Sequence, residues 1–268
     1  MFPEIELFGS KLATFSLMMA IGIVAALFIY MYSCKKDKVK KEDFDKFCML
    51  IPIILIGGFF GAMIFDKIAH WGEGGKKWYE PAGISFVGGL IAGALGFIVG
   101  HLLIIRKGFK QVFVDAERLI PSIVIAHSFG RVGCFFGGCC YGKPSNSIFA
   151  VTFPEGSLQH QQMGYITPVL PTQLFEAFFL LILFVVLFFF IKKYKVFIYL
   201  VSYAVFRFLL EYLRGDNRGK INTVFSPSQM TSFFLLLGAL VLIIYQIKVD
   251  FYGKKKEELV DNQNISTD

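Results

Sequence analysis

The segment PTQLFEAFFLLILFVVLFFFIKKYK, from Pro171 to Lys195, decides the fold class. Its residues 173–191 include a single charged side chain, that of Glu176, and the segment closes on lysines. A run of about 18 or more apolar residues with few charges is typical of a helix that crosses a membrane. The segment therefore predicts a transmembrane span that ends in a short basic turn.

The rest of the chain repeats this pattern. Of its 268 residues, 55% are hydrophobic and only 18% are charged, which is too apolar for a soluble domain of this length. We predict an all-α membrane protein with about seven spans in a single domain, 1–252, with an external loop at about 141–172 and a disordered cytoplasmic tail, 253–268. The predicted spans are 12–32, 48–68, 84–105, 119–139, 173–191, 196–213 and 227–247.

The segments that connect these spans alternate in charge. One set of alternate segments, which includes the C-terminal tail, holds 17 Lys and Arg residues, and the other set holds 7. Because cytoplasmic loops carry the excess of Lys and Arg, we predict that the N-terminus faces outward and the C-terminus lies in the cytoplasm. The same bias accounts for the net charge of +7 without a nucleic-acid partner.

Two pairs of ionisable side chains inside predicted spans are the candidate catalytic residues. A charged side chain at the centre of a span costs about 2.5–3.5 kcal/mol on insertion, so it needs a partner or a purpose. His127 and Arg131 are four residues apart, as are Arg207 and Glu211, and each pair shares a helix face. For Arg207 and Glu211, a neutral pair that only fixes helix packing is an equally good interpretation.

Arg131 lies in the stretch GRVGCFFGGCCYG, residues 130–142, at the predicted outer end of the fourth span. A guanidinium at this depth is suited to a phosphate, and phospholipids carry phosphate there. Gly133 and the nearby glycines permit close approach by a lipid or, alternatively, by a neighbouring helix. We predict a substrate site near the outer leaflet to which Arg131, Gly133 and Cys134 contribute.

Two polar residues open the fifth span. Gln173 and Glu176 are three residues apart and face the same way, so we expect them to line the same polar site. The alternative is that Glu176 only stabilises the positive end of its helix.

The sequence does not assign a role to the three cysteines of residues 130–142. Cys134, Cys139 and Cys140 have the spacing Cys-x4-Cys-Cys, which fits no common zinc pattern, so we expect neither a metal nor a cofactor. Three interpretations of these cysteines stay open: a disulfide, small buried thiols without a reaction, and reactive thiols at Cys139 and Cys140.

Several stretches, in order along the chain, resemble the prolipoprotein diacylglyceryl transferases of bacterial plasma membranes. FPEIELFG is similar to the family's Phe-Pro-Glu, ISFVGGLIAG to its Ser-Phe-His-Gly-Gly-Leu-Ile-Gly, and GRVGCFF to its Gly-Arg-hydrophobic-Gly-Asn-Phe. LPTQLFEA resembles its Pro-Ser-Gln-Leu-Tyr-Glu, and YAVFRFLLEYLR its Tyr-Gly-x-x-Arg-x-x-x-Glu-x-x-Arg.

The resemblance implies a multi-pass enzyme of the bacterial inner membrane with its active site towards the outer leaflet. Such an enzyme transfers the diacylglyceryl group of phosphatidylglycerol to the lipobox cysteine of a lipoprotein-precursor signal peptide, forming a thioether and releasing glycerol phosphate. Arg131 and Arg207 would then hold the phosphate, and Glu211 would orient Arg207.

The chain also departs from the family pattern. Val87 stands where the family carries a histidine implicated in catalysis, Ser16 lies about where a tyrosine is expected, and GGCCYG replaces an Asn-Gly-Glu segment. With Val87 in that place, His127 is the candidate general base. The departures leave two alternatives: a transferase of the same fold with a different acceptor, and a lipid-binding or lipid-translocating membrane protein without chemistry.

Overall fold

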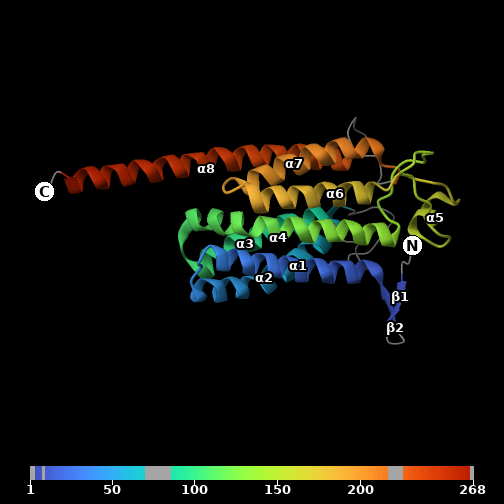
Figure 1. Cartoon of the computed structure of the whole chain (residues 1–268), viewed down its shortest axis with the longest axis horizontal. Helices are drawn as coiled ribbons and strands as arrows, with labels where there is room; N and C mark the ends of the chain where they lie inside the picture. The colour runs from blue at the N-terminus through green and yellow to red at the C-terminus, as the bar shows by residue number, and fades with distance from the viewer. Residues whose placement is uncertain (1–3, 8–9, 70–85, 217–225, 266–268) are drawn as a thin grey trace. The chain divides into compact units, whose positions relative to one another are not determined.

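A computed structural model describes residues 4–7, 10–69, 86–216 and 226–265 of the chain. Seven of its helices are long and apolar enough to cross a membrane, which confirms the predicted number of spans and the all-α class. A short antiparallel hairpin near the N-terminus pairs Glu4 with Ala13. The elements are β1 (Glu4–Leu7), β2 (Ser10–Ala13), α1 (Thr14–Lys36), α2 (Lys41–Ala69), α3 (Phe86–Gly100), the π-helical turn η2 (His101–Ile105), α4 (Gly108–Gly137), α5 (Leu158–Met163), α6 (Thr172–Val185), the π-helical turn η3 (Val186–Phe190), α7 (Lys195–Leu210), the 3₁₀ turn η4 (Glu211–Leu213) and α8 (Pro227–Ile265) (Figure 1).

Three helices, α2, α4 and α8, extend well beyond the apolar runs that predicted them. The fourth begins at Gly108 rather than at residue 119, so its 30 residues exceed the roughly 20 that a bilayer core requires. The last helix continues to Ile265 and includes most of the segment 253–268 that we predicted to be disordered. Its backbone is helical there because KKKEEL consists of residues with strong helix propensity.

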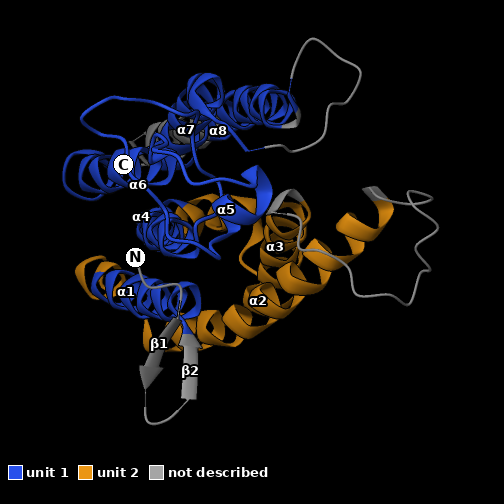
Figure 2. Ribbon diagram, turned by 90° about the vertical axis from the view of Figure 1, so that its right-hand side faces the viewer, with its two compact units in different colours: residues 1–32, 117–268 blue, residues 33–116 orange. Residues whose placement is uncertain are grey.

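The chain divides into two compact units, which are coloured in Figure 2. One comprises residues 1–32 and 117–268, and is called the main unit below; the other comprises residues 33–116. The single domain that the sequence predicts, and the orientation of the two termini, stay predictions.

The unit of residues 33–116 depends on glycines for its helix packing. A Cβ atom added at Gly61 of α2 would collide with the side chain of Ala92 on α3, and one at Gly88 would collide with Phe65. Backbones approach this closely only where small residues line the contact. A buried pair that the sequence did not reveal, His101 Nε2 with Asp115 Oδ2 at 2.9 Å, lies in the same unit.

In the main unit, α4, α6 and α7 share an apolar core. Backbone hydrogen bonds bring one end of each of these helices together: Gly142 N donates to Leu170 O at 2.8 Å, and Lys143 N donates to Leu213 O at 2.9 Å. The end of α4, the start of α6 and the end of α7 therefore meet beneath the loop 138–171. The core residues are Ile120, Val124, Leu180, Leu183, Leu187, Tyr199 and Tyr203.

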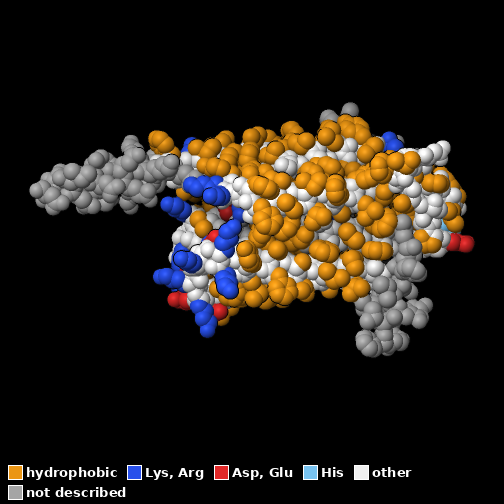
Figure 3. Space-filling view, viewed as in Figure 1, with side chains coloured by type: hydrophobic (Ala, Val, Ile, Leu, Met, Phe, Trp, Pro, Cys, Tyr) orange, Lys and Arg blue, Asp and Glu red, His pale blue; other side chains and the backbone are white. Residues whose placement is uncertain are grey.

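The helix surfaces match a lipid environment. On the side of the molecule that Figure 3 shows, hydrophobic side chains cover most of the surface, and Lys and Arg side chains gather mainly towards one end. The loop 138–171 contains only the short helix α5 and a small core of Tyr141, Phe153 and Val169, and no span, as the sequence predicts.

Candidate functional site

The centre of the candidate site is an ion pair between two helices of the main unit. Arg131 Nε on α4 lies 3.1 Å from Glu176 Oε1 on α6, and the Glu176 side chain is only 1% exposed. The Tyr203 hydroxyl on α7 donates to the same oxygen at 2.9 Å. Glu176 is thus the buried acceptor that holds Arg131 and joins the three helices at their polar end.

The second arginine has its own partners at the end of α7. Arg207 Nη1 lies 2.9 Å from Glu211 Oε2, as expected from their four-residue spacing, and Nη2 donates to Ser228 Oγ on α8 at 2.7 Å. Glu176 interacts electrostatically with Arg207 in addition to Arg131. The two arginines predicted to bind phosphate therefore face one buried carboxylate. The structure therefore brings Arg131, Arg207, Glu211 and Glu176 into one polar cluster.

His127, the candidate general base, lies one turn from Arg131 on the same face of α4. Its Nδ1 is 3.2 Å from the Tyr199 hydroxyl, and its ring packs edge-on against Tyr203, with centroids 4.9 Å apart. This arrangement places an imidazole beside the Arg131–Glu176 pair. Its role as a base stays a prediction.

The first turn of α6 holds the backbone of the cysteine segment. Gln173 Nε2 donates to Cys139 O at 2.6 Å, and Thr172 Oγ1 donates to Cys140 O at 2.8 Å. Since the amide nitrogen of Gln173 must face that carbonyl, its Oε1 points elsewhere and has no hydrogen-bond partner among the described residues. Gln173 is 1% exposed, so this acceptor oxygen is buried.

The structure favours a neutral state for the thiol of Cys139. All five cysteines lie in the described part of the chain, and none of them is in a disulfide. Hydrogen bonding to Cys134 and Cys140, together with burial, raises the pKa of Cys139 well above its ordinary value. A neutral thiol is a weak nucleophile, which argues against a covalent role for Cys139.

A third arginine borders this segment. Arg214, just beyond η4, donates from Nε to Asp216 Oδ1 at 2.8 Å. Burial works against its charged form, but the hydrogen bond to Asp216 and the nearby Cys140 thiol raise the pKa of the guanidinium above its ordinary value. Arg214 therefore stays charged next to the cysteines.

Gly133 contacts another helix in this structure. A Cβ atom at this position would lie 3.1 Å from Phe15 Cδ2 and 3.3 Å from Met18 Cβ on α1. This contact favours the helix-packing interpretation of Gly133, whereas its part in substrate binding stays a prediction. Ser16 is exposed on α1, and the side chain of Val87 lies outside the described part of the structure.

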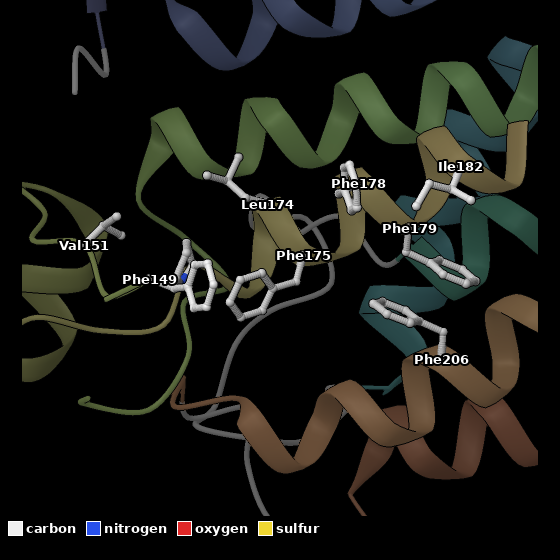
Figure 4. A pocket seen from close by; sticks show the side chains of 9 residues that line it. Phe149, Val151, Leu174, Phe175, Phe178, Phe179, Ile182 and Phe206 are labelled. Carbon is white, nitrogen blue, oxygen red and sulfur yellow. The ribbon is translucent and has the colours of Figure 1, made fainter. Parts of the chain in front are cut away.

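An apolar groove runs along α6, on the face opposite to the one that carries Gln173 and Glu176. It has a volume of about 580 Å³ and combines one helical stripe of α6 with loop residues and Phe206 of α7 (Figure 4). Phe179 and Phe206 stack with centroids 4.0 Å apart, and Phe178 is 66% exposed. The lining residues are Phe149, Val151, Pro171, Leu174, Phe175, Phe178, Phe179, Ile182 and Phe206.

The sequence did not identify all of the polar cluster. Tyr203 is four residues before Arg207, on the face that carries Glu211, so helical spacing could have found it. Tyr199 lies on the same face of the helix, one turn before Tyr203. Ser228 belongs to another helix, α8, and its contact with Arg207 could not be read from spacing within one helix.

Comparisons with known proteins support one family. The family model described as prolipoprotein diacylglyceryl transferase matches residues 4–245. Phosphatidylglycerol–prolipoprotein diacylglyceryl transferase 2 of Clostridium perfringens is 30% identical over 247 residues, which are 88% of this chain and 92% of the relative. The corresponding enzyme of Clostridium tetani is 29% identical over 259 residues, covering 93% and 98%, and that of Lactobacillus acidophilus is 30% identical over 250 residues, covering 88% and 86%. The chain therefore belongs to the prolipoprotein diacylglyceryl transferase family.

Proposed function

We propose that this protein is a membrane transferase that moves the diacylglyceryl group of phosphatidylglycerol to the lipobox cysteine of lipoprotein precursors. The observation that carries the proposal is the pair of arginines in one buried polar cluster, in a chain whose relatives are named for this reaction. No metal or cofactor is required by the proposed chemistry.

The reaction makes one bond and breaks one. The acceptor thiol loses its proton, its sulfur attacks the glyceryl carbon that bears the phosphate, and the carbon–oxygen bond breaks. The electron pair of that bond leaves with glycerol phosphate, so negative charge grows on the phosphate as the reaction proceeds. A catalyst therefore needs positive donors at the phosphate and a proton acceptor near the thiol.

Arg131 and Arg207 supply the positive donors. Each guanidinium is already oriented, by Glu176 and by Glu211, so little reorganisation is needed when a phosphate arrives. Preorganised donors of this kind stabilise the growing charge more than the starting charge, which is the condition for lowering a barrier.

Two further side chains complete the polar part of the proposal. His127 receives the thiol proton, because it is the histidine in the same span as Arg131 and lies beside the Arg131–Glu176 pair. The buried Oε1 of Gln173 accepts a hydrogen bond from a hydroxyl of the glycerol headgroup.

The apolar groove accommodates an acyl chain of the donor. Its stripe on α6 runs from Pro171 to Ile182, and eleven helical steps span about 16 Å, close to half of the roughly 30 Å hydrocarbon core. The groove begins at the end of α6 that carries Gln173 but lies on the opposite face, so the headgroup of a lipid there would pass around the start of α6 to reach the polar cluster.

The membrane placement is also part of the proposal. Positive charge in alternate loops supports an outward N-terminus, a cytoplasmic C-terminus and a site towards the outer leaflet of the bacterial plasma membrane.

The test incubates purified protein with isotope-labelled phosphatidylglycerol and a synthetic lipobox peptide, and measures the diacylglyceryl thioether by mass spectrometry. Arg131→Ala should lower turnover by about 100-fold or more, whereas Lys193→Ala, at an exposed lysine of the main unit, should not. Lipid that is bound but never consumed, while a relative is active in the same assay, would refute the transferase and support a lipid-binding role. Unchanged turnover in His127→Ala would exclude His127 as the base.

A further inference from the structure

Three cysteine sulfurs meet at the C-terminal end of α4 in the main unit. The Sγ atoms of Cys134, Cys139 and Cys140 all lie within 4.8 Å of one another, and all three residues are partly buried. The linear spacing of these cysteines gave no reason to expect a metal, because the sulfurs are brought together by a turn of the backbone rather than by a familiar ligand spacing.

The turn that brings the sulfurs together is held from several sides. The chain leaves α4 with Gly138 at φ 69° and Cys140 at φ 63°, and Cys139 N donates to Cys134 O at 3.2 Å. A left-handed conformation at a residue other than glycine is unfavourable, and persists only where neighbouring structure imposes it. Thr172 and Gln173 impose it here through their bonds to the carbonyls of Cys140 and Cys139.

The electrostatic surroundings suit sulfur anions that share a cation. Several sulfur anions cannot lie this close together without a positive charge between them. Arg131 interacts electrostatically with Cys134 and Cys140, and Arg214 with Cys140. Three thiolates around a dication leave one negative charge, and that charge would lie beside the guanidiniums of Arg131 and Arg214, each of which also faces a carboxylate.

We propose that Cys134, Cys139 and Cys140 bind one thiophilic divalent d¹⁰ cation of the Zn²⁺ class. Each thiol releases its proton to solvent as its sulfur bonds to the cation. Zinc–sulfur bonds of about 2.3 Å in a tetrahedral site imply sulfur separations of about 3.8 Å, so the sulfurs need to approach by no more than about 1 Å. Soft thiolate ligands select zinc and its heavier congeners over magnesium or calcium.

The bound cation would cross-link the end of α4 to the turn that Thr172 and Gln173 hold. It would therefore stiffen the rim of the polar cluster without taking part in diacylglyceryl transfer. The proposal does not depend on the transferase reaction, since all three ligands belong to the protein and the readout is metal binding.

The experiment titrates Cd²⁺, as a spectroscopic probe, into reduced full-length protein in neutral detergent and follows the sulfur-to-metal charge-transfer absorption. We expect one Cd²⁺ per chain, displaced by Zn²⁺. We call Cys134, Cys139 and Cys140 the cysteine trio. Replacing any one of them by alanine should weaken Cd²⁺ binding by more than about 10–100-fold, which is the effect typical of residues that only hydrogen-bond to a metal ligand. Cys48→Ala, at an exposed cysteine of α2, is the matched control and should leave the titration unchanged.

Two outcomes would overturn the proposal. One is Cd²⁺ binding that survives in the triple variant Cys134→Ala/Cys139→Ala/Cys140→Ala, with size-exclusion elution and thermal unfolding confirming that the variant is folded. The other is the absence of Cd²⁺ binding to the reduced wild type; a disulfide between two of the three cysteines after mild oxidation would then indicate a redox role in place of metal binding.

Discussion

Replacing Glu176 by glutamine tests whether Arg131 is the phosphate ligand. The glutamine keeps an acceptor oxygen for the Tyr203 hydroxyl, 2.9 Å away, and removes the charge that pairs with Arg131 and also interacts at longer range with Arg207. At the observed separation of 3.1 Å, the attraction is about 5 kcal/mol for an effective dielectric of 20. Breaking a buried pair typically destabilises a protein by about 3–5 kcal/mol, because the remaining charge stays buried and uncompensated.

The lipid should restore what the substitution removes. If the phosphate of phosphatidylglycerol binds Arg131, it supplies the negative charge that Glu176→Gln lacks. We therefore expect phosphatidylglycerol to raise the unfolding temperature of Glu176→Gln by more than it raises that of the wild type in neutral detergent. Turnover should still fall by about 100-fold, because the guanidinium is no longer oriented.

Diacylglycerol is the control lipid, since it has the same acyl chains and no phosphate, and it should shift both proteins equally. Glu155→Gln, at an exposed glutamate of the loop 138–171, is the control variant and should behave as the wild type does. Equal shifts of wild type and Glu176→Gln by phosphatidylglycerol would show that its phosphate does not bind Arg131, and would refute this reasoning.

Four more predictions follow from the same contacts. Arg207→Lys keeps the charge but loses the planar fork beside Glu211, so kcat/KM should fall by about 100-fold in the thioether assay. Tyr203→Phe removes a buried hydroxyl from Glu176 and should lower the free energy of unfolding by about 1–3 kcal/mol, measured by denaturant titration. Phe178→Ser should raise KM for long-chain phosphatidylglycerol and not for a short-chain analogue, because it interrupts the apolar groove. Protease added to intact cells should remove an epitope tag from the N-terminus and leave a C-terminal tag, and the opposite pattern would reverse the proposed topology.

The spans could be predicted because hydrophobic runs are a local property of the sequence. A stretch such as 173–191 must be helical in a bilayer, where every backbone polar group needs an internal partner. The Arg207–Glu211 pair could be predicted for the same reason, since four-residue spacing places both side chains on one helix face. The lengths of the helices were harder to predict, because the polar ends of α4 and α8 do not differ from loops in hydropathy.

The partner of Arg131 could not be predicted, and neither could the cysteine trio. Glu176 is 45 residues from Arg131 in the chain, and only the packing of α6 against α4 brings them together. The sulfurs of the trio meet because Cys140 adopts a left-handed conformation that α6 imposes from outside the motif. Both features depend on tertiary contacts that a single sequence does not encode in its local pattern.

The charge balance of the candidate site is compatible with the proposed binding of a phospholipid headgroup at the edge of a bilayer. Its three arginines are each paired with a carboxylate: Arg131 with Glu176, Arg207 with Glu211, and Arg214 with Asp216. The cluster is therefore neutral as a whole, which limits the cost of burying it. A phosphodiester adds one negative charge, and the departing glycerol phosphate, as a monoester, carries up to two. The bound phosphodiester therefore already gives one negative charge in excess of the arginines, and this excess grows during the reaction. The acceptor cysteine should for that reason enter as a neutral thiol and lose its proton inside the site, next to a group such as His127.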